Sequence, residues 1–387
     1  MVGLAKAIID CSLHQTLGPI LTQSAATPLF DVEFSLSIYN RTGKYFIGKD
    51  IIEACGDLLG ETYYGYYHSK TPPQRLFGKA LGRIQHLQVT GKALGGPFGL
   101  LPPHRPARPL LHMDPFSIPS TRLSEKDAVI CHDVGPITHP DLFDANTRPI
   151  YDHIYKQIAA VGPHVIFVSQ ATQKAFAACY PGAKLASERV IYPAIRQDVS
   201  GGEAEPVEGV KGPFLLTVGA LGTRKNQIRS MKAFTQSGLA KRGVTYVLCG
   251  SNEPGFEAVQ KAALETEGVV MLKYVSDAQL AWLYQNASGF VLPSLLEGFG
   301  MPVAEAIRYG LVPVVTKDSV LEEVAGDGAL GVDAENEAEI AAAMIRLIDM
   351  PDAERQDRRT QMTAAMSRFV PAAIAQQWRE TLIDMAR

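Results

Sequence analysis

Residues 214–316 alternate between short apolar runs and longer segments with the spacing of amphipathic helices. Strands that are separated by helices in this way form a parallel sheet with helices on both faces. The expected strands cover residues 214–218, 244–249, 268–273, 288–293 and 312–316. The expected helices cover residues 226–237, 255–264, 277–285 and 302–309. This alternation predicts an α/β domain built around a parallel sheet.

The end of the fourth expected strand carries the strongest functional signal. The apolar run Gly289–Ser294 predicts a buried strand that stops at a loop, so Glu297 lies just past a carboxyl end. Pro302 suits the first position of a helix, and Gly310 suits the residue in left-handed conformation that ends it. The N-terminus of this helix therefore points back to the sheet edge at which open α/β sheets bind ligands.

That helix start combines an anion site with two carboxylates. The dipole and amides of a helix N-terminus favour a bound phosphate, and glycines allow it to approach closely. The amides are expected from Gly300, Met301, Val303 and Ala304. Glu297 and Glu305 would repel a phosphate unless each binds a group of its own. A nucleotide sugar satisfies both conditions, because its diphosphate takes the amides while its ribose and sugar hydroxyls donate to the carboxylates.

A second strand end carries two cations. The strand at 214–218 leads through Gly219 to Arg224, Lys225 and Asn226 at the start of the next expected helix. Arginine grips two phosphate oxygens with its planar fork and lysine acts as a point charge, which suits a diphosphate. The alternative is a basic helix N-terminus held by nearby acids. We favour the diphosphate site, because two cations at this end oppose the helix dipole unless an anion is bound.

The pattern Glu-x7-Glu within 297–306 resembles the retaining glycosyltransferases of the GT-B fold, most closely glycosyltransferase family 4. The resemblance covers residues 212–333 and reaches the first half in patches. It implies an α/β protein with two Rossmann-like domains facing an interdomain cleft, and a C-terminal helix that crosses back to the first domain. The expected parts are an acceptor-binding domain at 1–196, a polar linker at 197–213, a nucleotide-sugar-binding domain at 214–368 and the crossing helix at 369–387.

The resemblance also implies roles for individual residues. Glu305 would hold the ribose, Glu297 would orient the sugar hydroxyls, and His132 would support the sugar from the first domain. The implied catalytic residues are His132, Glu297, Arg224 and Lys225. The implied donor-binding residues are Gly219, Arg224, Lys225, Tyr274, Val275, Glu297, Gly298, Phe299, Gly300, Met301 and Glu305, with Tyr274 and Val275 at the base pocket. No protein nucleophile is assigned.

The first half gives weaker signals. Strands are expected at 7–11, 32–38, 127–133 and 165–169, with helices at 45–58 and 170–179. The strand at 127–133 ends in His132 and Asp133, where the resemblance places a histidine beside the transferred sugar. The turn at Gly43 and Lys44 either resembles the glycine loop of the family or is a plain turn. Gly43, Lys44 and Asp133 are together the predicted acceptor or phosphate loop.

Residues 62–113 contain no acidic side chain. The basic residues of this segment are Lys70, Arg75, Lys79, Arg83, Lys92, Arg105 and Arg108. Within it, residues 76–87 place apolar side chains at helical spacing beside Lys79 and Arg83, which predicts a basic amphipathic helix. Three interpretations remain open. Residues 70–108 bind an anionic membrane surface, they bind the acceptor, or the helix is solvated and packs on its own domain.

Composition excludes several classes of protein. A length of 387 residues suits two or three domains, and a net charge of −3 argues against a nucleic-acid partner. Five dispersed cysteines without a C-x-x-C pair indicate reduced thiols in a cytosol. No apolar run reaches membrane-spanning length, which predicts a cytoplasmic protein that is at most peripheral on the inner face of the cell membrane. The sequence contains neither Asp-x-Asp nor a G-x-G-x-x-G after a first strand, so no metal and no cofactor are expected.

Together with the resemblance, which implies retention of the anomeric configuration, these observations predict a metal-independent, retaining hexosyltransferase. It would move a hexose or deoxyhexose from a GDP-mannose-like or UDP-sugar donor to a glycan or lipid-linked acceptor in bacterial surface polysaccharide synthesis. A nucleotide-sugar epimerase or hydrolase on the same fold is the main alternative, and it would act on the donor alone. The full set of charged site residues disfavours a silent binding subunit, and a dinucleotide oxidoreductase ranks last.

Overall fold

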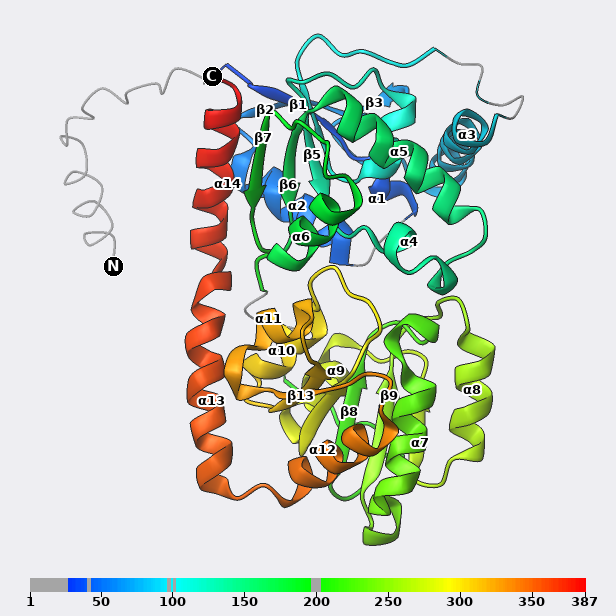
Figure 1. Ribbon diagram of the computed structural model, residues 1–387, viewed down its shortest axis with the longest axis vertical. Helices are drawn as coiled ribbons and strands as arrows, with labels where there is room; N and C mark the ends of the chain where they lie inside the picture. The colour runs from blue at the N-terminus through cyan, green and yellow to red at the C-terminus, as the bar shows by residue number, and fades with distance from the viewer. Residues whose placement is uncertain (1–26, 40–42, 96–98, 100–101, 196–202) are drawn as a thin grey trace, which may run out of the picture.

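The structure is a computed structural model that describes residues 27–39, 43–95, 99, 102–195 and 203–387. Two α/β lobes lie one above the other along the long axis of the molecule (Figure 1). Each lobe contains one sheet, and the predicted fold of two Rossmann-like halves is confirmed. The strand expected at 7–11 lies outside the described residues.

The first sheet has seven strands, and all its neighbours are parallel except one antiparallel pair at the edge. In spatial order they are β3 (Tyr67–His68), β2 (Leu59–Tyr64), β1 (Phe30–Glu33), β4 (Leu110–His112), β5 (Ala128–Cys131), β6 (His164–Phe167) and β7 (Ser187–Val190). The accompanying helices are α1 (Leu36–Tyr39), α2 (Gly43–Cys55), α3 (Arg75–Leu94), α4 (Gly135–Thr138), α5 (Thr147–Val161) and α6 (Gln170–Cys179), with 3-10 turns η1 (Pro115–Ser120) and η2 (Pro140–Leu142).

The second sheet has six parallel strands. In spatial order they are β10 (Val269–Leu272), β9 (Thr245–Cys249), β8 (Phe214–Val218), β11 (Gly289–Leu292), β12 (Pro313–Thr316) and β13 (Leu330–Val332). Its helices are α7 (Gln227–Ser237), α8 (Phe256–Glu265), α9 (Asp277–Asn286), α10 (Met301–Arg308), α11 (Val320–Ala325) and α12 (Glu337–Asp349), with 3-10 turns η3 (Thr223–Lys225), η4 (Leu239–Arg242) and η5 (Gly326–Gly328). Every strand and helix expected between 214 and 316 is present.

The strand expected at 32–38 ends earlier than predicted. The alternating run at 32–38 predicts a single strand, but β1 stops at Glu33 and α1 begins at Leu36. The amide and hydroxyl of Ser37 both donate to the carbonyl oxygen of Phe34, and the amide of Ser35 donates to the buried carboxylate of Glu33. Local hydrogen bonds of this kind turn the chain out of the sheet.

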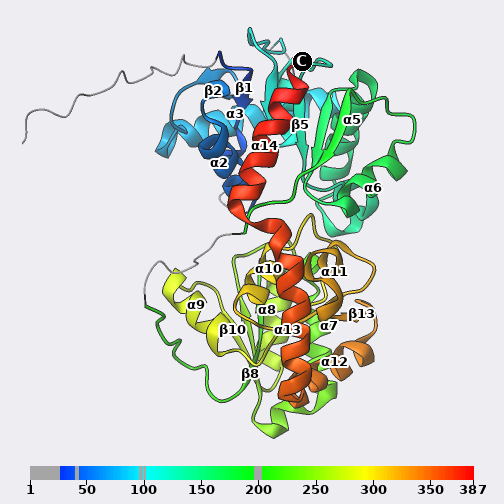
Figure 2. The ribbon, with the colours of Figure 1, turned by 90° about the vertical axis from the view of Figure 1, so that its left-hand side faces the viewer.

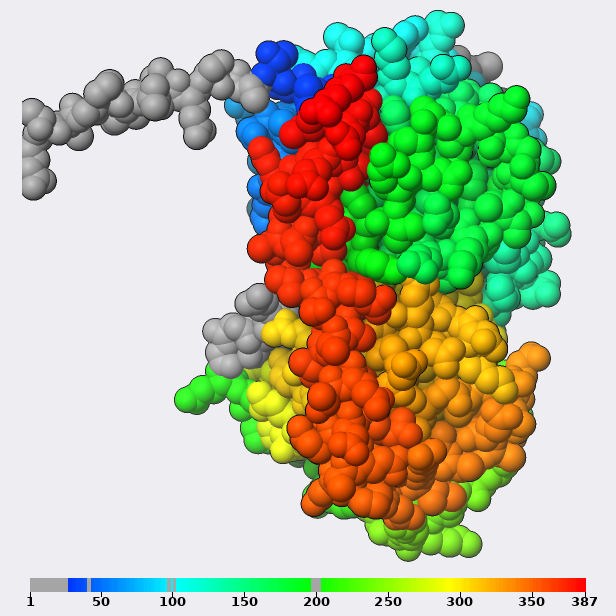
Figure 3. Space-filling view, turned by 60° about the vertical axis from the view of Figure 1, so that its left-hand side comes forward, coloured from blue at the N-terminus to red at the C-terminus, as the bar shows by residue number. Residues whose placement is uncertain are grey.

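The C-terminal segment lies across both lobes (Figures 2 and 3). It consists of α13 (Asp352–Met366), the turn η6 (Ser367–Phe369) and α14 (Pro371–Met385). The expected apolar stripe of α14 is buried, and its members are Ile374, Trp378, Leu382 and Met385. Arg379 on the same helix pairs with Asp57 just past α2, at 2.5 Å between guanidinium and carboxylate. The last helix of the chain therefore packs on the first lobe.

The basic helix α3 shows an outward apolar face. Its buried side chains include Gln85, Gln88 and Val89, whereas Leu76 is 83% exposed and Phe77 and Ile84 are each 51% exposed. The stripe that the sequence places beside Lys79 and Arg83 therefore does not pack into its own domain. Among the described helices, none combines the length and apolar character needed to cross a bilayer.

Candidate active site

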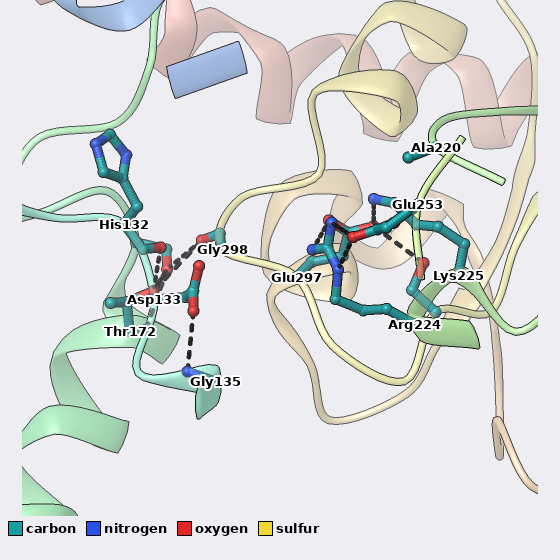
Figure 4. Close-up of polar contacts among 12 residues, drawn as sticks. His132, Asp133, Gly135, Thr172, Ala220, Arg224, Lys225, Glu253, Glu297 and Gly298 are labelled. Atoms are coloured by element: carbon teal, nitrogen blue, oxygen red, sulfur yellow. Dashed lines mark hydrogen bonds and ion pairs between the residues drawn. The ribbon is translucent and has the colours of Figure 1, made fainter. Parts of the chain in front are cut away.

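The carboxyl ends of both sheets meet between the lobes. Strand β5 runs into His132 and Asp133, and β11 runs into the loop that carries Glu297 and Gly298. A cavity of about 350 Å³ between the lobes is lined by residues of both, including Asp133 and Glu297. Figure 4 shows the polar contacts on its two sides, joined by the 297–298 loop.

On the second lobe, two cations surround one buried carboxylate. The Lys225 ammonium donates a hydrogen bond to Glu297 Oε1, which also accepts from the Ser294 hydroxyl at 3.0 Å. The Arg224 guanidinium lies 3.8 Å from Glu297 Oε2 and forms a closer pair with Glu253, at 2.7 Å. The turn η3 places both cations at the carboxyl edge, so three of the predicted residues are brought together.

This arrangement corrects one step of the sequence argument. Two cations at a helix start were expected to require a bound anion, but internal carboxylates already pair with them. Burial lowers the pKa of Arg224, while Glu297 and Glu253 raise it by more, so the net pKa is raised. Glu253 is a site residue that the sequence reasoning missed. Its signal was its place in the loop after β9, another carboxyl end.

The start of α10 is also only partly as expected. Gly300 has a φ of 95° and caps the helix, a conformation that suits glycine. The amides of Val303 and Ala304 already donate to the Gly300 carbonyl oxygen, at 2.9 and 3.3 Å. The prediction that these two amides bind phosphate is therefore wrong, because the first turn of the helix uses them. Those of Gly300 and Met301 remain the predicted donors.

The other predicted donor-binding residues differ in burial and in the contacts that they make. Glu305 lies in the second turn of α10 and accepts a hydrogen bond from the Tyr284 hydroxyl at 3.0 Å. The Phe299 ring is buried against Phe369, 5.2 Å between centroids, so it contributes to the core rather than to a donor surface. Tyr274 is 88% exposed, and Val275 packs partly against the core. Gly219 lies beside the Lys225 side chain.

On the first lobe, His132 is buried and its imidazole is fixed by the main chain. Its Nε2 lies 2.8 Å from the Met113 carbonyl oxygen. A carbonyl only accepts hydrogen bonds, so Nε2 carries the proton and Nδ1 is the acceptor. Burial and the neighbouring Lys44 lower the pKa of His132 to about 4, and the ring is neutral at pH 7. In Figure 4 the ring points away from the cations of the second lobe.

The predicted acceptor or phosphate loop, which consists of Gly43, Lys44 and Asp133, has contacts in both lobes. Lys44 pairs with the buried carboxylate of Asp114 at 3.1 Å, and Asp133 accepts from the Gly135 amide at 2.9 Å. A Cβ on Gly43 would lie 3.9 Å from the Met301 side chain at the start of α10. The start of α2 therefore faces the second lobe. Asp114 was not predicted, although it follows the carboxyl end of β4, which the sequence reading also missed.

Direct hydrogen bonds join the lobes beside the cleft. The Ser169 hydroxyl donates to the Gly298 carbonyl oxygen at 2.9 Å. The Glu323 carboxylate of α11 accepts from the amides of Gln170 and Ala171 at the start of α6, at 2.8 and 2.9 Å. An acid at a helix N-terminus is favourable, so this carboxylate links the two lobes through a helix cap.

Residues 203–365 match the family described as glycosyl transferases group 1. This region is a group 1 glycosyltransferase domain. It confirms the predicted resemblance, and the motif Glu297–Ala306 lies inside it. Within the described residues, no group of three or more His, Cys, Asp or Glu side chains is arranged to hold a metal ion.

Two curated relatives of the chain are bacterial mannosyltransferases. The chain is 27% identical over 239 residues to the O-antigen chain mannosyltransferase RfbU of Salmonella typhimurium, covering 60% of this chain and 63% of the relative. It is 32% identical over 138 residues to the O-antigen chain mannosyltransferase B of Escherichia coli, covering 34% of this chain and 36% of the relative. Both matches span less than two thirds of the relative's length.

Solved structures with the same fold cover nearly all of the chain. Trehalose-6-phosphate synthase OtsA matches with a TM-score of 0.64 at 14% identity, covering 93% of this chain and 99% of that one. The trehalose-phosphate synthase of Burkholderia xenovorans, in complex with glucose-6-phosphate, matches with a TM-score of 0.59 at 14% identity, covering 90% and 85%. At these identities the likeness shows the fold alone, which is the GT-B fold.

Proposed function

We propose that the chain is a retaining hexosyltransferase of bacterial surface polysaccharide synthesis. Its donor is a nucleoside-diphosphate hexose or deoxyhexose, with GDP-mannose first among the candidates because the relatives are named mannosyltransferases. The acceptor is a glycan or a lipid-linked glycan. The observation that carries the proposal is the placement of Arg224 and Lys225 around Glu297, which lines the cleft opposite Asp133 of the first lobe.

Sugar transfer builds negative charge on the departing diphosphate and positive charge at the anomeric carbon. We propose that this diphosphate binds at Arg224 and Lys225, which pair with Glu253 and Glu297 in the structure. Cations that are fixed in position stabilise the negative charge that develops on a leaving group. We propose that they act in place of a divalent ion.

The remaining residues are proposed to bind the sugar. Nδ1 of the neutral His132 ring accepts a sugar hydroxyl, and the Glu297 and Glu305 carboxylates accept from hydroxyls of the sugar and ribose. The amides of Gly300 and Met301 bind the diphosphate. The His132 tautomer supports this assignment, because the Met113 carbonyl leaves Nδ1 as the acceptor.

Incubation with a nucleotide sugar and an acceptor glycan tests the proposal. We expect an extended glycan whose new linkage has the same anomeric configuration as the donor in its NMR coupling constants, with and without a chelator. Inversion would refute retention, and loss of turnover in the chelator would refute metal independence. Equal consumption of donor without acceptor would show a hydrolase or epimerase instead.

We also propose that α3 contacts an anionic membrane surface. Leu76, Phe77 and Ile84 are exposed beside Lys79 and Arg83, in a segment with no acidic residue. Apolar side chains that insert beside basic ones favour anionic lipid. The variant Leu76→Ser/Phe77→Ser should lose binding to phosphatidylglycerol vesicles in a flotation assay. Retained binding would remove the membrane contact from the proposal.

A further inference from the structure

A second cavity lies on the first lobe, away from the cations of the donor site. It encloses about 870 Å³ between α1, α3 and η1, within the range of ligand pockets. Its lining residues are Leu36, Ile38, Tyr39, Lys44, Lys79, Gly82, Arg83, His86, Leu87, Asp114, Phe116 and Tyr151. In Figure 1, α3 lies beside α1 and α5 on the upper lobe.

The inner part of this cavity adjoins the cleft. Lys44 and Asp114 line it and form their 3.1 Å ion pair there. Lys44 belongs to the first turn of α2, and its neighbour Gly43 faces Met301 of the second lobe. A molecule in the cavity therefore has one end next to the start of α10, where the donor is proposed to bind.

The walls of the cavity are aromatic. The Tyr39 and Phe116 rings meet edge to face with centroids 6.1 Å apart, and Tyr151 lies 6.3 Å from Phe116. Aromatic rings present an apolar face together with, in tyrosine, a polar group. This combination suits a sugar ring, which has an apolar C–H face and hydroxyls at its edge.

The rim of the cavity is cationic. Lys79 and Arg83 are four residues apart on α3 and so lie on the same face of the helix. Among the described residues, no carboxylate pairs with either of them, and the one acid of the cavity, Asp114, already pairs with Lys44. The rim therefore carries two positive charges that an anion would neutralise. Arginine and lysine together suit a phosphate group.

The outer side of the rim is apolar. Leu87 lines the cavity and is 36% exposed, and Leu76 precedes Lys79 by one turn on the outer face of α3. An apolar chain that leaves the phosphate at Lys79 and Arg83 would pass over these side chains. A phosphate at Lys79 and Arg83 would therefore lie next to exposed apolar side chains of α3.

We propose that this cavity is the acceptor site, and that its ligand is a saccharide joined through phosphate to an apolar chain. The proposal rests on the proposed glycosyl transfer, and it adds which residues bind each part of the acceptor. The aromatic walls bind the sugar, Lys79 and Arg83 bind the phosphate, and the reacting hydroxyl points toward Met301.

Isothermal titration with hexyl mannosyl phosphate, a probe that stays monomeric in water, tests the assignment without a membrane. We expect Lys79→Gln/Arg83→Gln to weaken its binding on the order of 30-fold, the scale of lost charge-assisted hydrogen bonds. Hexyl mannoside, which lacks the phosphate, should bind weakly to both proteins and show no such difference. Inorganic phosphate alone should bind far more weakly than the probe, and equal affinity would mean a simple anion site.

The matched control is Lys70→Gln/Arg105→Gln, which removes the same charge from exposed positions of the same segment outside the cavity. It should bind the probe as the unmodified protein does. Arg224→Ala should also bind it unchanged, whereas a loss there would place the probe in the donor site and overturn the assignment. If the rim variant binds the probe normally while nucleotide binding persists, only the acceptor site is refuted. Absence of nucleotide binding to the unmodified protein would refute the proposed transfer instead.

Discussion

The main chains of His132 and Gly298 meet across the cleft, where a Cβ atom on Gly298 would lie 2.3 Å from the His132 carbonyl oxygen. The Gly298 carbonyl oxygen in turn accepts from the Ser169 hydroxyl of the first lobe. The loop that carries Glu297 is therefore fixed against the strand end that carries Asp133. The two halves of the proposed site can lie this close together only because residue 298 is a glycine and has no Cβ atom.

Gly298→Ala should separate the lobes and slow catalysis. A methyl group at this contact must displace main chain rather than a flexible side chain, and a shift of about 1 Å at a reacting centre costs on the order of 100-fold in rate. We expect kcat to fall on that scale in a steady-state transfer assay. Gly182→Ala, at an exposed site with no atom within 4 Å, is the control and should leave kcat unchanged. Full activity in the Gly298 variant would show that the cleft tolerates a wider opening.

Arg224→Ala should lower kcat/KM by about 100-fold, the usual scale for removal of one preorganised donor. The guanidinium lies at the edge where the leaving diphosphate is proposed to bind, and the alanine variant keeps only the Lys225 cation there. Initial rates at several donor concentrations measure the effect. Lys241→Ala, an exposed lysine of the second lobe, serves as the matched loss of charge. Equal rates in the Arg224 variant and the control would remove Arg224 from the mechanism.

Glu253→Gln should tighten binding of the donor nucleotide. In the structure the Arg224 guanidinium pairs with Glu253 at 2.7 Å, so a diphosphate must compete with this carboxylate. Glutamine keeps the shape but removes the charge, and we expect the Kd of GDP or UDP to fall on the order of 5-fold, a fraction of a charge-assisted hydrogen bond. Isothermal titration measures it, with Glu257→Gln on the exposed start of α8 as the control. Weaker binding would mean that Glu253 positions Arg224 for the donor.

The second lobe could be predicted almost completely because its local signals agree with its packing. Its strands are continuous apolar runs, as buried parallel strands must be, and each is followed by a helix that the sequence marks with glycine, proline or a capping residue. The first lobe was harder. Strands β2 (Leu59–Tyr64) and β4 (Leu110–His112) carry polar residues or are short, and their pairing with β1 depends on contacts distant in sequence.

The candidate site shows a similar limit. The sequence alone predicted Arg224, Lys225 and Glu297 as site residues, because each follows the carboxyl end of an expected strand. Spacing could not show that Glu253 pairs with Arg224, since these residues meet only when β8 and β9 lie side by side. Nor could it show that the first turn of α10 uses the amides of Val303 and Ala304. Partners of a charge are set by tertiary structure.

Buried histidines should make the protein less stable in mild acid. Burial lowers the pKa of His112 to about 4, from an ordinary value of 6.5 in the unfolded chain. Between these pH values the unfolded chain binds a proton that the folded protein does not, so stability is complete above pH 6.5 and falls as pH decreases toward 4. The full effect of one such group is about 3 kcal/mol.

The variant His112→Asn removes this group and should flatten the decline of Tm between pH 7 and pH 5, measured by differential scanning fluorimetry. The control His139→Gln changes an exposed histidine and should keep the original slope. An unchanged slope in the His112 variant would show that other groups set the sensitivity to acid.

The final helix should stabilise the protein through its buried side chains rather than its ion pair. Trp378 is 3% exposed where α14 packs on the first lobe, and truncation of a buried aromatic residue costs about 3–5 kcal/mol. The pair of Arg379 with Asp57 lies at the surface, where such pairs contribute about 1 kcal/mol or less. Urea unfolding should therefore show a large loss of stability for Trp378→Ala and a small one for Arg379→Ala. Similar losses in both variants would mean that the ion pair stabilises the packing of α14 as much as the apolar stripe does.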